Sequence, residues 1–156
     1  MRALVVYYSR TGRTRRVAEA LARQMGADVE ELREDKDRSG LVGYVGAGRD
    51  ATFGRPASLH PVKATVADYD LVLVGTPVWA FTMATPVRAF LDAYGATIRR
   101  AAFFCTLGSN GDERTFRNMA ALCPNACAAR LTLTEKQVAG PGWEASLAPF
   151  ITAATA

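Results

Sequence analysis

Three short and nearly continuous apolar runs constrain the fold of this chain more than any other feature. They cover residues 3–8, 71–75 and 101–107. An apolar run of this length, without regular polar alternation, is typical of a β-strand that is covered on both faces. Such strands form parallel sheets with helices packed on each side, so the runs predict a layered α/β fold.

The segments between these runs supply helices and two further strands. Apolar residues recur at helical spacing over 14–25, and Gly26 stands where a helix usually ends. The other expected elements are helices over 86–94, 113–122 and 143–155 and strands over 28–33 and 127–133. Five strands joined by helical crossovers predict a three-layer, doubly wound, five-stranded parallel sheet in one domain spanning residues 1–156.

Residues 34–68 follow no clear period. Five glycines between positions 40 and 54 interrupt any helix there, at about 1 kcal/mol each. A short helix near 41–51, followed by a loop punctuated by Pro56 and Pro61, is the expectation for this segment.

The composition is that of a globular protein, with 49% hydrophobic and 22% charged residues. No apolar run approaches the roughly 20 residues that a membrane span needs. The chain starts directly as a strand, without the features of a signal peptide, so a cytoplasmic location is expected. Three cysteines without C-x-x-C spacing and a single histidine make a poor zinc set, and no metal is expected.

The phosphate-binding candidate is the loop after the first strand, Ser9-Arg10-Thr11-Gly12-Arg13-Thr14. It offers three hydroxyls, a glycine and the start of a helix, whose free backbone N–H groups suit an anion. It lacks the spacing of nucleoside-triphosphate loops and of the dinucleotide fingerprint. A plain helix cap by Thr14 is the alternative, and it leaves the other hydroxyls and the glycine unexplained.

The net charge is +4, and arginines cluster in this same loop and helix start, with Arg99-Arg100 as a second pair. Cations in a first helical turn oppose the helix dipole, and a bound anion would reverse that interaction. The alternative is that Arg13, Arg15 and Arg16 extend into water, where their charges are screened. The clustering suggests an anionic partner, but no aromatic-interleaved basic patch supports nucleic acid.

The loop resembles the phosphate loop of flavodoxin-like proteins, [S/T]-x-T-G-x-T, and matches it at every fixed position. The resemblance implies that residues 9–14 hold the phosphate of flavin mononucleotide (FMN). It also implies the flavodoxin strand order 2-1-3-4-5. Flavodoxin is itself a standard example of ligand binding beyond the carboxyl ends of parallel strands, so this order is not an independent derivation.

Two further loops carry the resemblance. The segment from Gly75 to Leu91 resembles the flavin-ring loop and the helix after it, which implies that the isoalloxazine lies along Pro77, Val78, Trp79, Ala80, Phe81, Thr82 and Met83. Trp79 and Phe81 suit stacking on a flat ring, with packing against the sheet as the alternative. Such proteins often carry glycine where Phe81 stands. The third loop, implied to contact the flavin pyrimidine, is Gly108, Ser109, Asn110 and Gly111; an ordinary turn is its alternative.

Other families with this architecture fit poorly. A receiver domain needs an acidic pair where this chain has Ser9-Arg10, and a low-molecular-weight phosphatase needs a cysteine well before Cys105. The single histidine, His60, falls in the irregular segment, which argues against a hydrolase triad.

The favoured hypothesis is an FMN-dependent oxidoreductase, in which the cofactor supplies the electron chemistry and no catalytic side chain is required. Electrons would come from NAD(P)H or a protein donor and pass to a quinone, a nitro or azo compound, or a partner protein. Electron-carrying flavodoxins are usually acidic, whereas this chain is basic. The alternatives are an electron carrier, or a non-catalytic domain that has lost FMN and binds another anion or partner. A homodimer that completes the site is also left open.

Overall fold

The computed structural model describes residues 1–34 and 59–156, and the helix expected near 41–51 and the loop at Pro56 lie outside this part. Its centre is a parallel sheet whose strands follow the order β2-β1-β3-β5-β6. The strands are β1 (Ala3–Tyr7), β2 (Asp28–Glu31), β3 (Leu71–Trp79), β5 (Ala101–Leu107) and β6 (Ala126–Thr134). Counted along the chain, these five parallel strands have the order 2-1-3-4-5, which confirms the expected fold class.

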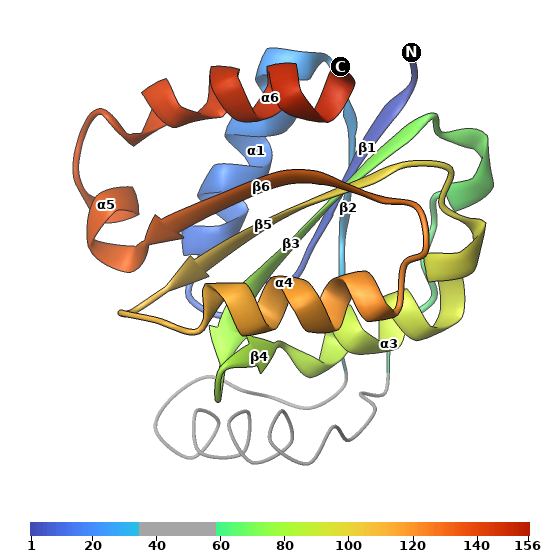
Figure 1. Ribbon diagram of the computed structural model, residues 1–156, viewed down its shortest axis with the longest axis horizontal. Coiled ribbons are helices and arrows are strands. Elements are labelled where there is room, and N and C mark those ends of the chain that lie inside the picture. The colour runs from blue at the N-terminus through green and yellow to red at the C-terminus, as the bar shows by residue number, and fades with distance from the viewer. Residues whose placement is uncertain (35–58) are drawn as a thin grey trace.

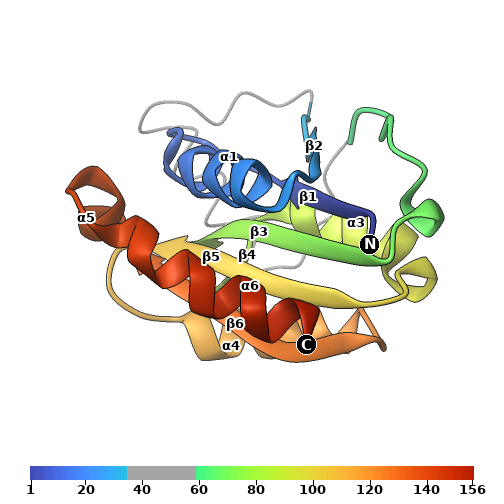
Figure 2. The same ribbon diagram turned by 90° about the horizontal axis from the view of Figure 1, so that it is seen from above.

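Helices cover both faces of the sheet. The α-helices are α1 (Arg13–Met25), α3 (Thr85–Tyr94), α4 (Asp112–Ala121), α5 (Glu135–Ala139) and α6 (Leu147–Thr155). Short 3₁₀ helices are η1 (Val66–Asp68), η2 (Gly95–Thr97) and η3 (Trp143–Ser146). Helices α1 and α6 lie on one face of the sheet and α3 and α4 on the other, as Figures 1 and 2 show.

Two hydrophobic cores follow from this layering. Alternate residues of each buried strand point to opposite faces, so Val5 packs toward α1 and α6 while Val6 packs toward α3 and α4. The first core includes Leu21 of α1 and Phe150 of α6, and the second includes Phe90 of α3. The apolar runs are therefore buried on both faces, as their sequence predicted.

Several local predictions are confirmed by the backbone. Gly26 ends α1 in the left-handed conformation, with φ of 62°. Pro86 lies in the first turn of α3, where its missing N–H is no loss. The unexpected Pro149 is explained in the same way, because the predicted helix 143–155 divides into η3 and α6 and places this proline in the first turn of α6.

None of the helices formed by residues 1–34 and 59–156 has the length and apolar character needed to cross a bilayer.

The middle of the sheet depends on close packing between β3 and β5. Gly75 of β3 pairs in register with Phe104 of β5. A Cβ added to Gly75 would overlap the ring of Phe104, which is fully buried. The two strands therefore accept only glycine here unless the ring moves.

We expect Gly75→Ala to destabilise the protein by about 1–3 kcal/mol, the usual cost of overpacking a core. Urea unfolding would measure it, with Gly108→Ala as control because nothing lies within 4 Å of a Cβ there. In a double-mutant cycle, Phe104→Leu should absorb part of the loss. Strictly additive effects of the two substitutions would contradict the packing explanation.

Candidate functional site

The loops that follow β1, β3 and β5 meet at the carboxyl edge of the sheet (Figure 1). A cleft of about 160 Å³ lies between them. Its lining comes from the first loop and α1, the end of β3, the end of β5 and α5: Arg10, Thr11, Thr14, Pro77, Val78, Trp79, Thr106, Gly108 and Glu135. Four segments that are far apart in the sequence thus form one concave surface.

The first loop presents a helix start with free donors. Gly12 precedes α1 in the left-handed conformation, with φ of 97°, and its N–H donates to Ser9 Oγ at 3.0 Å. No side chain caps the helix, and its first turn contains no acidic residue. The backbone N–H groups of that turn are therefore available to an anion.

Thr14 does not cap the helix. The Ncap position belongs to Gly12, and Thr14 lies inside α1 with 2% of its surface exposed. Its hydroxyl pairs with the hydroxyl of Thr106 at 2.7 Å, which joins α1 to β5 across the floor of the cleft. One hydroxyl of the pair donates to the other, so the acceptor keeps its own proton for a further partner.

The arginines near the helix start have different roles. Arg15 forms an ion pair with Glu31 and a hydrogen bond to the Tyr7 hydroxyl, and Glu31 raises the pKa of Arg15. Arg16 donates to the carbonyl of Val138 at 2.6 Å and lies over the ring of Trp143. These two cations therefore hold α1 to its neighbours rather than extending into water.

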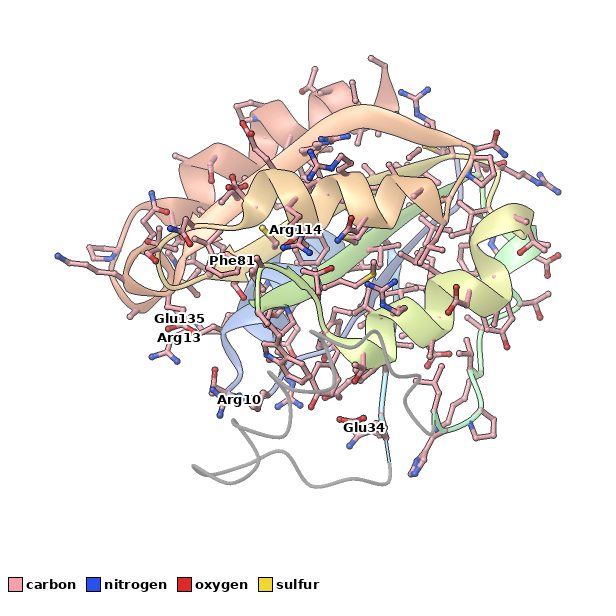
Figure 3. The ribbon with its side chains drawn as sticks, turned by 60° about the horizontal axis from the view of Figure 1, so that its bottom comes forward. Arg10, Arg13, Glu34, Phe81, Arg114 and Glu135 are labelled. Atoms are coloured by element: carbon pink, nitrogen blue, oxygen red, sulfur yellow. The ribbon has the colours of Figure 1, made fainter. Side chains whose placement is uncertain are left out.

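Arg10 and Arg13 point from the first loop to the side of the cleft where Glu135 lies (Figure 3). Arg13 Nη1 donates to Thr11 Oγ1 at 3.2 Å, and among the described residues no carboxylate forms an ion pair with Arg13. Of these two arginines, Arg10 lines the cleft, and Glu135 places a carboxylate in the same lining.

The expected flavin-ring loop is a β-hairpin, which corrects the prediction of a loop after residue 75. Strand β3 continues to Trp79, and β4 (Thr82–Met83) returns antiparallel to it, with Trp79 opposite Thr82. Ala80 and Phe81 form the two-residue turn with φ of 48° and 63°. A non-glycine residue in this left-handed region costs about 1–2 kcal/mol.

The two aromatic side chains of the hairpin differ in exposure. Phe81 at the tip is 54% exposed, whereas Trp79 is 5% exposed and packs edge-on against Tyr8, with ring centroids 5.3 Å apart. Trp79 lines the cleft from within the packed structure. Thr82 and Met83, also predicted to lie along the flavin, are buried behind the turn. Phe81 is therefore the hairpin's freely accessible aromatic ring.

The third loop joins the hairpin through Gly111. Gly108, Ser109 and Asn110 are exposed, and Gly111 precedes α4 with φ of 104°. A Cβ on Gly111 would lie 3.0 Å from Val78 Cγ1 and 3.1 Å from Phe81 Cα. Only glycine allows this close approach, so the second and third loops form one packed unit.

Sequence reasoning missed two residues of the cleft. Thr106 was treated as part of a buried strand, although a polar residue in an apolar run was a usable signal. Glu135 begins α5, a helix too short for periodicity to reveal. Its capping box, formed by Thr134 and Gln137, follows the T-x-x-Q pattern and could have located it.

The flavodoxin family model matches residues 2–140, and the chain therefore belongs to the flavodoxin family. Flavodoxins bind FMN, so the cofactor inferred from the first loop is confirmed at the level of the family. A search of curated proteins finds no match.

Solved structures share the fold at low sequence identity. A flavoprotein from Lactobacillus acidophilus, in complex with FMN, is 19% identical with a TM-score of 0.73, covering 86% of this chain and 93% of that chain. A candidate flavoprotein from Bacteroides eggerthii is 16% identical with a TM-score of 0.79, covering 99% and 98%. A WrbA-like flavodoxin from Agrobacterium tumefaciens is 18% identical with a TM-score of 0.62, covering 99% and 95%. These likenesses establish the fold.

The strained turn gives a test of the site's backbone. We expect Ala80→Gly to stabilise the protein by about 0.5–1 kcal/mol, because relief of the left-handed strain exceeds the added entropy of the unfolded chain. Thermal unfolding should show Tm rising by roughly 1–4 °C.

The matched control is Ala93→Gly, on the exposed surface of α3. There glycine should cost about 1 kcal/mol. A loss of stability in both variants would show that the turn stores no strain.

Proposed function

We propose that this protein is an FMN-dependent oxidoreductase whose first loop binds the cofactor phosphate. The observation that carries the proposal is the uncapped start of α1, which opens into the cleft beside the hairpin. Its residues fit a phosphate dianion, because N–H donors, hydroxyls and cations converge there without an acidic residue in the first helical turn.

In this proposal each loop has one task. The backbone of residues 11–14 and the hydroxyls of Ser9, Thr11 and the Thr14–Thr106 pair bind the phosphate, with Arg10 and Arg13 balancing its charge. Residues 77–83 orient the ring, with Phe81 as the exposed stacking surface. Residues 108–111 present their backbone to the pyrimidine edge, and at Gly111 only glycine fits against the hairpin.

The bound flavin supplies electron transfer, so no side chain of the site has to act as acid, base or nucleophile. We propose NAD(P)H or a protein as the donor and a quinone, a nitro or azo compound, or a protein as the acceptor. The net charge of +4 supports a role other than that of the usual acidic carriers. The cytoplasmic location and the homodimer stay predictions from the sequence.

Two other functions have a supporting observation. Membership of the flavodoxin family supports an electron carrier that serves an acidic redox partner. Phe81, at a position where such proteins often have glycine, supports a domain that has lost the flavin and binds another anion or partner.

We expect the purified protein, mixed with FMN and freed of excess, to retain the flavin absorption bands. Thr11→Ala and Gly12→Val should each raise the Kd for FMN at least about tenfold, a loss of about 1.4 kcal/mol or more. Thr11→Ala removes a hydroxyl, and Gly12→Val strains the left-handed residue that opens the helix.

Gly26→Val is the matched control, because Gly26 is left-handed at the other end of the same helix. It should cost similar stability and leave the Kd unchanged. Equal affinity in wild type, Thr11→Ala and Gly12→Val would overturn the phosphate assignment, and a colourless protein that refuses FMN would favour the flavin-free alternative.

The enzyme hypothesis predicts turnover. The FMN-loaded protein, given NADH or NADPH with a quinone or nitroaromatic compound, should oxidise the nucleotide faster than free FMN at the same concentration. Failure to exceed free FMN, together with reduction by a separate reductase at a rate that falls steeply with salt, would identify the carrier instead.

A further inference from the structure

The hairpin that carries the strained Ala80–Phe81 turn has few hydrogen bonds of its own. Strand β4 has only two residues and provides a short ladder to β3. At the base of the hairpin, Thr76 Oγ1 accepts the Ala84 N–H at 2.9 Å and donates to the carbonyl of Pro77. Two-residue turns with positive φ favour glycine and asparagine, and this turn has alanine and phenylalanine instead. Contacts beyond the short β3–β4 ladder must therefore stabilise the hairpin.

The side chain of Thr82 joins the hairpin to two helices. Thr82, directly after the turn, is 4% exposed, and its Oγ1 accepts a hydrogen bond from Asn118 Nδ2 of α4 at 2.9 Å. Arg88 Nη2 of α3 donates to the same oxygen at 3.5 Å, while Arg88 Nε is buried without a partner. The shorter bond from Asn118 is the stronger of the two.

The hydrogen bond between Asn118 and Thr82 lies directly after the Ala80–Phe81 turn. Gly111, the residue before α4, packs against Phe81 Cα, and Asn118 within α4 donates its hydrogen bond to Thr82. Helix α4 therefore contacts the turn and the residue after it. Loss of the hydrogen bond from Asn118 removes one restraint on the turn, so we expect the backbone of Ala80 and Phe81 to relax more readily toward negative φ and the ring of Phe81 to move with it.

We propose that Asn118 is a positioning residue that holds the Ala80–Phe81 turn in its left-handed conformation before the flavin binds. The inference rests on the proposed FMN site for its functional consequence, but the backbone effect belongs to the protein alone. A site organised in advance loses less freedom on binding, so the tether raises the affinity for FMN without contacting it.

The test compares Asn118→Ala with Asn125→Ala. Asn125 Nδ2 also donates one hydrogen bond of 2.9 Å, to the carbonyl of Ile98. This bond lies beside the start of β5, at the amino ends of the strands and so away from the cleft. In the protein without FMN, amide hydrogen exchange of residues 80–84 should accelerate at least about fivefold in Asn118→Ala, a change of about 1 kcal/mol. Asn125→Ala should leave those amides unchanged.

The Kd for FMN should rise about three- to tenfold in Asn118→Ala and stay unchanged in Asn125→Ala. Thr82→Val, which removes only the accepting oxygen, should reproduce both effects if Asn118→Ala folds poorly. Adding Ala80→Gly to Asn118→Ala should restore slow exchange and affinity, because glycine adopts the left-handed turn without the tether.

Equal exchange of residues 80–84 in Asn118→Ala and Asn125→Ala would overturn the inference, as would faster exchange with an unchanged Kd. A protein that binds no FMN would refute the proposed function, and the exchange measurement on the flavin-free protein would still decide whether Asn118 holds the turn.

Discussion

Parallel pairing of β1, β3 and β5 is the constraint from which the site follows. Because these strands run in the same direction and are buried on both faces, the chain returns from each through a crossover, and the loops at their carboxyl ends emerge at one edge. The phosphate-loop candidate, the hairpin and the third loop meet for this reason. The close contact of Gly75 with Phe104 keeps β3 and β5 nested just before β3 extends to form the hairpin.

Electrostatics at the start of α1 explain why the arginines gather there. The positive end of the helix dipole and the cation of Arg13 lie together without an acidic residue in the first turn, an arrangement that is unfavourable without an anion. Arg15 and Arg16 avoid this cost through Glu31 and the Val138 carbonyl, and so fasten α1 to β2 and α5. Of the arginines at this helix start and in the loop before it, Arg10 lines the cleft.

The sequence predicted the strands, most helices and the location of the three loops, because buried runs, helical spacing and glycine positions are local signals. The hairpin could not be predicted in this way. Pro77 lacks an N–H and argues against a continuing strand, and Ala80-Phe81 is not a turn signal. A hydrogen bond from Ala84 to Thr76 at the base of the hairpin and tertiary contacts from Gly111 and Asn118 override those local preferences. Departures from local rules are expected where a protein builds a functional site.

The position of Phe81 follows from the same balance between strain and tertiary contacts. Gly111 packs against the turn and Asn118 bonds to the residue after it, so the exposed aromatic ring is supported from α4 and from the residue before that helix. Arg114, labelled in Figure 3, belongs to α4, the helix that also carries Asn118. The same helix begins with Asp112 and Glu113, so its acidic and basic side chains oppose one another in the field they produce at this edge. What α4 contributes is therefore shape, because Gly111 before it packs against the turn and Asn118 within it bonds to Thr82.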